Sequence, residues 1–567
     1  MTQDPGTAHA ATYASSIVEL LLTVGHVDGL FHVHEQAFVQ RYIESVLLQV
    51  EESAPASERV SLRAAWQTHF HELYQRLDRE VAGLADQAGA AWQQGRVPSA
   101  LRSRAMALFS ALPAQEQKTS LELVHALIHA DRVLTPPEQQ LYHDLTSHFS
   151  AEASGGAGPV TVRMQALVDE PPAAQATAPL VVKAPVQREL VALSHSLIDP
   201  LERTYSPHPI ERKSQIDWDF QLIQQAANQW QRQRTAGAGR LAGVADATQV
   251  PAGARFLDGH VYAFKPTRPT ELVVLGDLHG CYSCLKAALL QSNFIQRVWA
   301  HQWDPQRYPD IKLVLLGDYI DRGRYSFDGV LRAVLYLFLS MPDNVFVLRG
   351  NHEYFRWYQN RVVSGVYPAE ALASIAPHVP GEMLEAYRLM FEQMPTSLLV
   401  DQLLFVHGGI PRDDTFEARY RDLSSLNDSE LRFQMLWSDP VPGQFIPVEL
   451  QRQNPRFSFG YNQFGAFMDR LKLNTMIRGH EQINQGFHVV YKMGEQQLLT
   501  LFSAGGKDNS DLPAESSYRG VTPMALTIEV GNDAPTATPW PLQYQPFNYP
   551  PHNGLYRPHP LLEFRYV

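Results

Sequence analysis

The sequence predicts an α/β region preceded by an all-helical region, and three observations lead to this fold class. Apolar residues recur at helical spacing in the first 150 residues, for example in SIVELLLTVGHVD and AFVQRYIESVLLQVEE. From about Ala254 onward, short apolar and β-branched runs alternate with helical stretches, as is typical of buried strands in an α/β layer structure. Several of these runs end in Gly-Asp, Gly-Asn or His-Gly, so the turns that follow them carry polar side chains.

Composition and charge narrow the class of protein. The chain has 567 residues, which corresponds to about three domains or to one large domain with additions. Its net charge of −12 and the lack of a run of basic residues argue against nucleic acid as the main partner. Because Cys281 and Cys284 are the only cysteines, a reducing compartment is expected. No signal-peptide pattern or apolar run of membrane-spanning length is found, so the sequence predicts a cytoplasmic protein without a membrane partner.

Four segments differ in composition. Residues 1–150 are rich in Ala, Leu, Gln and Glu and are predicted to form an all-α domain. Residues 151–253 begin with a stretch dense in Ala, Pro and Gly and are predicted to be a linker with helical segments. Residues 254–535 are predicted to form the α/β domain. Residues 536–567 hold too many prolines for a helix or a central strand, so we expect a tail that wraps over the surface or docks a partner.

The N-terminal region contains a repeated arrangement of acidic residues. Asp28 and Asp131 each end an apolar helical stretch, and Glu35 and Glu138 follow them at the same spacing. In one interpretation the acids cap the next helix and stabilise its dipole. In the other interpretation they form a paired acidic site for a cation.

The first copy of this repeat resembles a known family. Asp28, Gly29, Leu30 and Glu35 match the D-G-x-φ-x-x-x-E pattern of TerB-like helical domains from tellurite resistance, while the second copy has Arg132 in place of the glycine. The resemblance covers roughly the first 150 residues and implies an all-α domain. Through this domain the chain is expected to contact a protein partner.

Five short motifs carry the polar residues that can do chemistry. Four of them follow the strand-like runs LVVL, KLVLL, VFVL and LLFV, and the fifth follows the shorter TMI. Ligand sites in open α/β sheets lie at the carboxyl ends of strands, and glycines there let the backbone turn sharply. The motifs are, in chain order, Gly276-Asp277-Leu278-His279-Gly280, Gly317-Asp318-Tyr319-Ile320-Asp321-Arg322-Gly323, Gly350-Asn351-His352-Glu353, His407-Gly408-Gly409 and Arg478-Gly479-His480.

Six side chains in these motifs indicate a metal site. They combine carboxylate, amide oxygen and imidazole with no thiolate, a set that suits Mn, Fe or Zn better than Ca. Six ligands exceed the need of one tetrahedral ion, but with one bridging carboxylate they suit two ions about 3.5–4 Å apart. A single Asp after a strand is usually a turn residue. Chance is a poor explanation for five such motifs in this order. The six are Asp277, His279, Asp318, Asn351, His407 and His480.

With these motifs the sequence resembles the PPP-type serine/threonine phosphoprotein phosphatases of the calcineurin-like metallophosphoesterase superfamily, over about residues 255 to 530. The segment Leu436-Trp437-Ser438-Asp439-Pro440 looks like the L-W-S-D-P segment of that family, and Pro455-Arg456 looks like its P-R dipeptide. The resemblance implies a sandwich of two β-sheets flanked by helices.

Residue roles follow from this resemblance position by position. His352 is expected to be the general acid that protonates the leaving alkoxide, with Asp321 orienting it. Arg322 and Arg456 are expected to bind the phosphoryl oxygens through charge-assisted hydrogen bonds. For Arg456 a surface arginine stays an alternative, because its spacing to the following Phe-Gly is longer than usual in the family. The metal ligands divide into Asp277 and His279 on the first ion, Asp318 bridging both, and Asn351, His407 and His480 on the second.

The resemblance also implies a reaction. A metal-bound hydroxide would hydrolyse a phosphate monoester, with phosphoserine or phosphothreonine on proteins as the expected substrate. The cofactors would be two divalent or trivalent metal ions, with manganese favoured and iron or zinc as alternatives. An alternative substrate is a dinucleoside polyphosphate or another small phosphoester. An alternative of another class is a sensor or scaffold that keeps an inert phosphatase fold.

Three features depart from the family or stay open. The segment between His279 and Asp318 is long, and we expect it to shape substrate access. The family's S-A-P-N-Y-C segment is replaced by FSAGGK over residues 502–507, so its tyrosine is missing. Cys281 and Cys284 form a CxxC pair at a predicted helix start, where either ordinary packing or a redox role is open.

Overall fold

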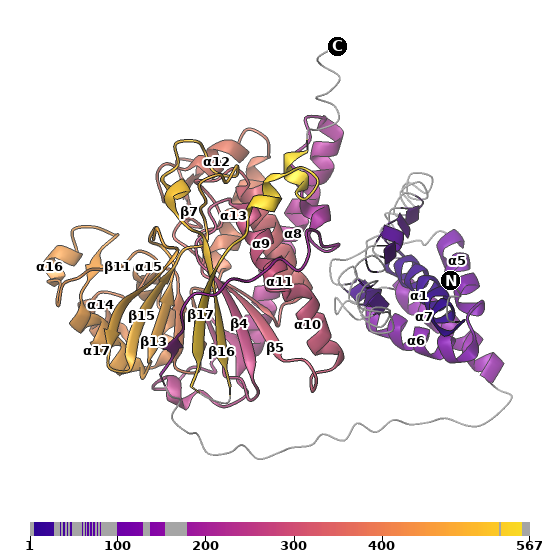
Figure 1. Cartoon of the computed structure of the whole chain (residues 1–567), viewed down its shortest axis with the longest axis horizontal. Helices are drawn as coiled ribbons and strands as arrows, with labels where there is room; N and C mark the ends of the chain where they lie inside the picture. The colour runs from indigo at the N-terminus through magenta and orange to yellow at the C-terminus, as the bar shows by residue number, and fades with distance from the viewer. Residues whose placement is uncertain are drawn as a thin grey trace, which may run out of the picture. The chain divides into compact units, whose positions relative to one another are not determined.

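The computed structural model (Figure 1) divides into two compact units, Met1–Glu170 and Pro171–Val567. Among the described residues, no helix has both the length and the apolar character needed to cross a membrane. The residues described are 5–27, scattered helical positions between 35 and 80, 99–128, 136–153, 179–531 and 534–557.

The N-terminal unit is helical in its described part. Its apolar residues lie at helical spacing and build one core, in which Leu21, Phe109, Leu127 and Leu145 are fully or almost fully buried. The named helices are α1 (Pro5–Gly25), α5 (Ser99–Ser110), α6 (Ala114–Ile128) and α7 (Pro136–Ala153).

The acidic repeat of this unit is only partly described. Glu35 and Glu138 are both buried, whereas Asp28 and Asp131 lie outside the described residues. The TerB-like motif residues Gly29 and Leu30 lie outside them as well. The TerB-like assignment and the two interpretations of the acids therefore stay predictions.

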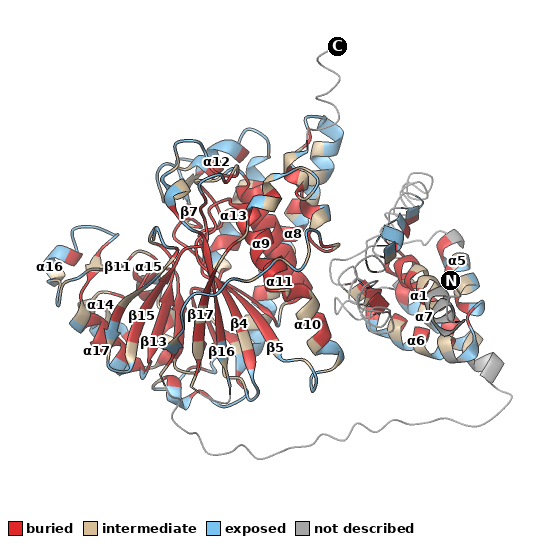
Figure 2. Ribbon diagram, in the orientation of Figure 1, coloured by how far each residue is buried: buried red, intermediate tan, exposed pale blue. Residues whose placement is uncertain are grey.

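The second unit contains two large β-sheets flanked by helices, which confirms the predicted fold class (Figure 1). Its strands are mostly buried, and its helices range from buried throughout to exposed on their outer faces (Figure 2). The six-stranded sheet has the order β1 (Val181–Val182), β17 (Thr536–Pro541), β16 (Met524–Val530), β4 (Thr270–Leu275), β5 (Asp310–Leu315) and β6 (Val345–Val347). The seven-stranded sheet has the order β14 (Phe487–Met493), β15 (Gln496–Leu501), β13 (Thr475–Arg478), β10 (Leu403–Val406), β9 (Ser397–Val400), β3 (Val261–Phe264) and β2 (Arg255–Asp258).

Helices and two small sheets surround these two sheets. Helices α10 and α11 lie beside the six-stranded sheet, and α14 and α17 lie beside the seven-stranded one (Figure 1). The helices are α8 (Pro209–Gly237), α9 (Tyr282–Gln291), α10 (Phe294–Trp303), α11 (Arg332–Ser340), α12 (Glu370–Ile375), α13 (Gly381–Gln393), α14 (Asp413–Arg419), α15 (Ser429–Met435), α16 (Val448–Gln451) and α17 (Tyr461–Leu471). The small sheets pair β7 (Phe355–Tyr358) with β8 (Arg361–Ser364) and β11 (Asp439–Pro440) with β12 (Ser458–Phe459).

Parallel pairing in both sheets sets the position of the motifs. Strands β4, β5 and β6 are parallel neighbours, with Val274 opposite Val314 and Val314 opposite Phe346. In the other sheet β10 and β13 are parallel, with Phe405 opposite Ile477. Because parallel strands end at the same edge of their sheet, the turns that follow them meet.

Residues 151–253, predicted to be a linker with helical segments, contain helix α8 in their described part, but this part packs into the second unit. Strand β1 joins the six-stranded sheet, and the N–H of Val181 donates to the Pro535 carbonyl at 2.8 Å. Helix α8 buries Trp230, whose ring stacks on Phe338 with a centroid distance of 4.8 Å. The Ala- and Pro-rich composition did not reveal these contacts, because they depend on partners far along the chain.

The structure also corrects part of the predicted proline-rich tail, residues 536–567. Its first residues form β17, which lies between β1 and β16 and is therefore not an edge strand. The Val186 N–H donates to the Pro539 carbonyl at 3.0 Å, so Pro539 turns its carbonyl and ring nitrogen away from β16. A proline is tolerated there because no ladder donor toward β16 is lost.

The long segment before Asp318, expected to shape substrate access, leads to the end of β5 opposite to the motif loop. It forms α10 and the turn after it, and this turn leads into Asp310 at the amino end of β5. The Asp318 motif follows the carboxyl end of the same strand.

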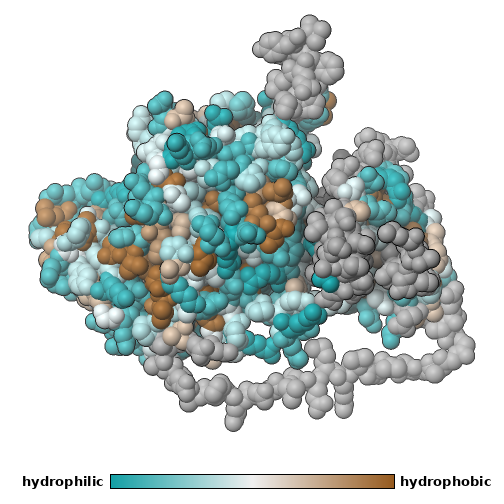
Figure 3. All heavy atoms as spheres, viewed as in Figure 1, coloured by the Kyte–Doolittle hydropathy of each residue, from teal (hydrophilic) through white to brown (hydrophobic). Residues whose placement is uncertain are grey.

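On the face shown in Figure 3, the described surface is mostly hydrophilic with separate hydrophobic patches.

Candidate active site

The motif residues occupy the turns directly after five strands, as the sequence predicted. Asp277 follows β4, Asp318 follows β5, Asn351 follows β6, His407 follows β10 and His480 follows β13. All five side chains are buried. The carboxyl edges of the two sheets therefore face each other across one polar cluster.

The turns require unusual backbone conformations. Asp318 has φ +55° and His279 has φ +43°, in the left-handed region that residues other than glycine seldom adopt. Gly350 is needed for a different reason, since a Cβ there would lie 2.1 Å from the Asp318 Oδ1. Backbone strain of this kind persists where the surrounding structure holds it, and it clusters at functional sites.

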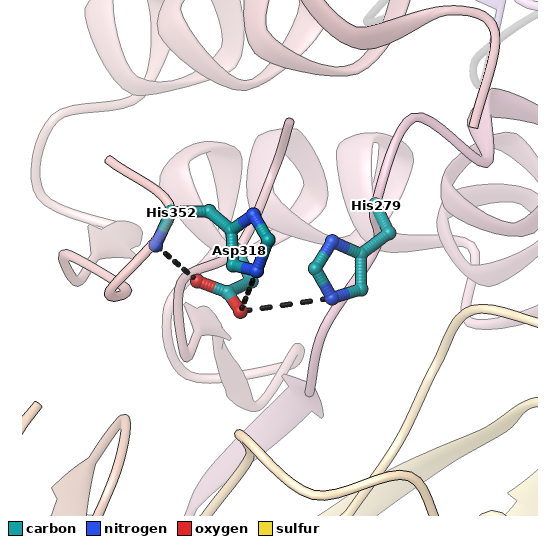
Figure 4. A group of neighbouring side chains, drawn as sticks. All are labelled: His279, Asp318 and His352. Carbon is teal, nitrogen blue, oxygen red and sulfur yellow. Dashed lines mark hydrogen bonds and ion pairs between the residues drawn. The ribbon is translucent and has the colours of Figure 1, made fainter. Parts of the chain in front are cut away.

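One half of the cluster centres on the Asp318 carboxylate (Figure 4). The His279 Nε2 lies 3.6 Å from the Asp318 Oδ2 and 3.7 Å from the Asp277 Oδ2. From the other side, the His352 Nε2 lies 3.8 Å from the same Asp318 oxygen, and its backbone N–H donates to the Asp318 Oδ1 at 3.0 Å.

The other half centres on the Asn351 amide oxygen. The His407 Nε2 lies 2.8 Å from the Asn351 Oδ1, and the His480 Nδ1 lies 2.9 Å from it. The His407 Nε2 is also 3.3 Å from the Asp318 Oδ1, so Asp318 is common to both halves. The structure thus brings all six predicted metal ligands together.

The hydrogen bonds of two histidines orient their Nε2 atoms toward the cluster. The Nδ1 of His279 faces the Ile320 carbonyl at 2.9 Å, and the Nδ1 of His407 faces the Leu316 carbonyl at 3.0 Å. Carbonyls only accept, so each Nδ1 carries a proton, and in the neutral form of each ring the Nε2 presents a lone pair. Those lone pairs face carboxylate and amide oxygens, an arrangement that a cation between them stabilises.

Two further observations support the fit. The Asp277 Oδ2 and the His480 Nε2 are buried and make no hydrogen bond with the described residues. Burial, with the charge of Asp318, raises the pKa of Asp277 to about 7. The nitrogen and oxygen donors without sulfur match manganese, iron or zinc.

His352 and Asp321 form the predicted pair. The His352 Nδ1 and the Asp321 Oδ2 are 2.7 Å apart, which leaves the Nε2 of His352 directed at the cluster. The other oxygen of Asp321 accepts the Ala371 N–H at 2.8 Å, so the carboxylate is held from two sides. Burial acts to lower the pKa of His352, but the charge of Asp318 and the hydrogen bond with Asp321 raise it to about 9.

Each of the two predicted phosphate-binding arginines is paired with a carboxylate. The Arg322 Nη1 donates to the Glu370 Oε1 at 2.8 Å. The Arg456 Nε donates to the Asp439 Oδ2 at 2.6 Å. Asp439 also accepts from the buried Arg478 at 2.8 Å and lies 3.8 Å from the His480 Nε2, which links Arg456 to the cluster.

Sequence reasoning gave no role to Glu353, which organises the turns. Its buried carboxylate accepts the backbone N–H groups of Asp318 at 2.9 Å, Tyr319 at 2.8 Å and Gly350 at 3.0 Å. A glutamate directly after His352 was visible in the motif, but its backbone partners were not.

Sequence reasoning also missed Tyr518. Its ring stacks on that of His279 with a centroid distance of 5.3 Å and an interplanar angle of 29°. It lies outside residues 502–507, where the family tyrosine is missing, so no local pattern indicated it. A tyrosine ring thus lies beside His279 although the family's own tyrosine is missing.

The CxxC pair behaves as a packing element. Cys281 and Cys284 are free and fully buried, and α9 begins at Tyr282 between them. Burial raises the pKa of the Cys281 thiol well above its usual value, which disfavours a reactive thiolate.

Comparison with known proteins gives one family match and several similar solved structures. Residues 270–484 match the family model of the calcineurin-like phosphoesterases. A protein serine/threonine phosphatase from Saccharomyces cerevisiae is similar at 17% identity and a TM-score of 0.37, over 57% of this chain and 89% of that one. A cold-active protein-tyrosine phosphatase from a psychrophilic Shewanella is similar at 17% identity and a TM-score of 0.30, over 50% and 82%. A purple acid phosphatase from yellow lupin seeds is similar at 9% identity and a TM-score of 0.23, over 50% and 55%.

Proposed function

We propose, from the match of residues 270–484 to the calcineurin-like phosphoesterase family model, that the chain is a two-metal phosphatase that hydrolyses phosphoserine and phosphothreonine on proteins. The observation that carries the proposal is the convergence of six nitrogen and oxygen donors around Asp318, beside the His352–Asp321 pair. Two ions bound there would activate a water molecule and stabilise the charge of the phosphoryl group.

The residues of the chain supply the remaining chemistry. Water attacks phosphorus, the ester P–O bond breaks, and the products are inorganic phosphate and a serine or threonine hydroxyl. His352 donates the proton of its Nε2 to the leaving oxygen, and Asp321 holds the ring in position through the 2.7 Å hydrogen bond. Arg322 and Arg456 bind phosphoryl oxygens. To do so, Arg322 leaves the carboxylate of Glu370 and Arg456 leaves that of Asp439.

A hollow beside these residues supports a polypeptide substrate. It has a volume of about 1080 Å³ and lies between the β7–β8 hairpin, α12 and α13. Trp357 and Tyr367, which line it, are 55% and 94% exposed. Ala369 lines the hollow directly before Glu370, the partner of Arg322, so a peptide side chain bound there would lie near the phosphate.

The N-terminal unit is proposed to act separately from this chemistry. We propose that residues 1–150 form the TerB-like all-α domain and that this domain binds a protein partner, in a cytoplasmic setting. The catalytic unit would begin near β1 and not at residue 254, where the sequence placed its boundary. The reason is that β1 and α8 pack into it.

A substrate comparison tests the proposal. The manganese-loaded protein is given a panel of phosphoserine and phosphothreonine peptides and, separately, diadenosine tetraphosphate. We expect turnover of peptides to exceed that of the nucleotide. Cleavage of the nucleotide alone would mean that the substrates are small phosphoesters and not phosphoproteins. No cleavage of any phosphoester would favour the sensor or scaffold alternative.

A further inference from the structure

Arg322 is held by a short segment that borders the active site. Its Nη1 donates to the Glu370 Oε1 at 2.8 Å and to the Pro368 carbonyl at 3.4 Å. Glu370 is the first residue of α12. The side chain that the proposed function directs at the phosphoryl group therefore already has an anionic partner.

The position of Glu370 is fixed by its neighbour. The Ala371 N–H donates to the Asp321 Oδ1 at 2.8 Å, and Asp321 directly precedes Arg322. Asp321 and Arg322 have φ values of +67° and +66°, so this turn has a defined backbone. The start of α12 and the Asp321-Arg322 turn thus form one hydrogen-bonded unit.

The Arg322–Glu370 pair is exchangeable because it is exposed. The side chains are 25% and 45% exposed, and ion pairs of this kind contribute little to stability because water screens them. A phosphate dianion carries more charge than a carboxylate and offers more acceptor oxygens. It can therefore displace Glu370 from the guanidinium.

The Arg456–Asp439 pair differs in this respect. Asp439 also accepts from Arg478, whose side chain is fully buried, and it lies beside His480. Removing Asp439 would leave Arg478 without this partner. Of the two carboxylates, Glu370 is the one that can be substituted without taking a partner from a buried group, so the competition is testable there.

We propose that Glu370 competes with the phosphoryl group for Arg322, and so sets the affinity of the site for phosphate esters and for product phosphate. The inference rests on the proposed function, in which Arg322 binds phosphate. When the substrate binds, Arg322 turns from Glu370 to the phosphoryl oxygens. After hydrolysis Glu370 recaptures Arg322, which favours release of inorganic phosphate.

Substituting Glu370→Gln in the full-length, manganese-loaded protein tests the competition. The inhibition constant of inorganic phosphate should fall about two- to fivefold, the factor that corresponds to an exposed ion pair. Phosphate binding measured by isothermal titration calorimetry should tighten by the same factor. A weaker affinity would mean that Glu370 positions Arg322, and an equal affinity would mean that it does not compete; either result overturns the proposal.

Glu515→Gln is the matched control. Glu515 is an exposed acid of the second unit that neither lines the hollow proposed for the substrate nor pairs with Arg322, which donates to Glu370. Its removal should leave phosphate affinity unchanged, which separates competition for Arg322 from a general change in charge.

A double-mutant cycle with Arg322→Ala completes the test. Arg322→Ala should weaken phosphate binding, and Glu370→Gln in that background should then change it no more than Glu515→Gln does. A full effect of Glu370→Gln without Arg322 would overturn the inference. If the wild-type protein hydrolyses no phosphomonoester and Arg322→Ala leaves phosphate binding unchanged, the proposed function itself fails. If the enzyme is active but Glu370→Gln leaves phosphate affinity unchanged, only the inference about Glu370 fails.

Discussion

His352 and Asp321 are hydrogen-bonded across 2.7 Å although 31 positions separate them in the sequence. They come from the turns after two neighbouring parallel strands, β6 and β5, which bring their side chains together. The pair leaves one imidazole nitrogen, Nε2, facing the metal ligands. This geometry makes the role of His352 directly testable.

Replacement of His352 by alanine should reduce kcat for a phosphoserine peptide by about 10²- to 10⁴-fold, because the leaving alkoxide loses its proton donor. An aryl phosphate should lose less, because its leaving group needs protonation less. Metal content, measured by mass spectrometry, should stay at the wild-type value. An unchanged kcat on the phosphoserine peptide would remove His352 from the role of general acid.

Removal of metal should abolish activity and reduce stability together. Bound ions separate acceptors that otherwise face one another, and each contributes about 3 kcal/mol at a free concentration of ~100 Kd. We expect chelation to lower the melting temperature of the wild-type protein. The melting temperature of the Asp318→Asn variant should not change on chelation. Asp343→Asn, an acid with a 62% exposed side chain, should keep it. Full activity after rigorous chelation would refute the metal site.

Loss of Asp219 should destabilise the second unit. Asp219 on α8 receives two hydrogen bonds from Arg332, at 2.8 and 2.7 Å, and their side chains are 3% and 1% exposed. Asp219→Ala leaves a buried charge unpaired and should lower the free energy of unfolding by about 3–5 kcal/mol in urea titrations. Lys213→Ala on the same helix, in a pair that is 75% and 54% exposed, should change it by less than about 1 kcal/mol. Equal changes in the free energy of unfolding for the two variants would mean that the buried pair on α8 adds no more stability than the exposed one.

His260 should make the second unit sensitive to mild acid. Burial, together with Arg432 and Arg234, lowers the pKa of His260 to about 3. Below the ordinary pKa of about 6.5 the unfolded chain takes up a proton that the folded chain refuses, so stability falls as the pH falls. At pH 5 this one group lowers the free energy of unfolding by about 2 kcal/mol relative to pH 8.

The variant His260→Asn tests this linkage. Its side-chain amide can still donate to the Met394 carbonyl, which the His260 Nδ1 faces at 3.0 Å. The difference in unfolding free energy between pH 8 and pH 5 should shrink by about 2 kcal/mol, whereas the difference between pH 8 and pH 7.5 should not change. An unchanged acid response would show that other groups cause it.

Some of the structure could be predicted from local patterns alone. Asp277, Asp318 and Asn351 each follow a short apolar run within a few residues, so their place after a strand was visible without any partner. The same holds for the division into a helical region and an α/β region. These features depend on residue spacing and turn chemistry, which act over a few positions.

What the sequence by itself determined was the kind of side chain that follows each strand, and hence the donor set of the site. Only the tertiary structure decided which distant groups surround that set: Tyr518 on the ring of His279, Glu370 on Arg322, and β17 inside a sheet despite its prolines. The physical reason is that each of these contacts joins residues far apart in the chain. Such a contact forms through packing and pairing in the folded state and leaves no periodic signal in either segment.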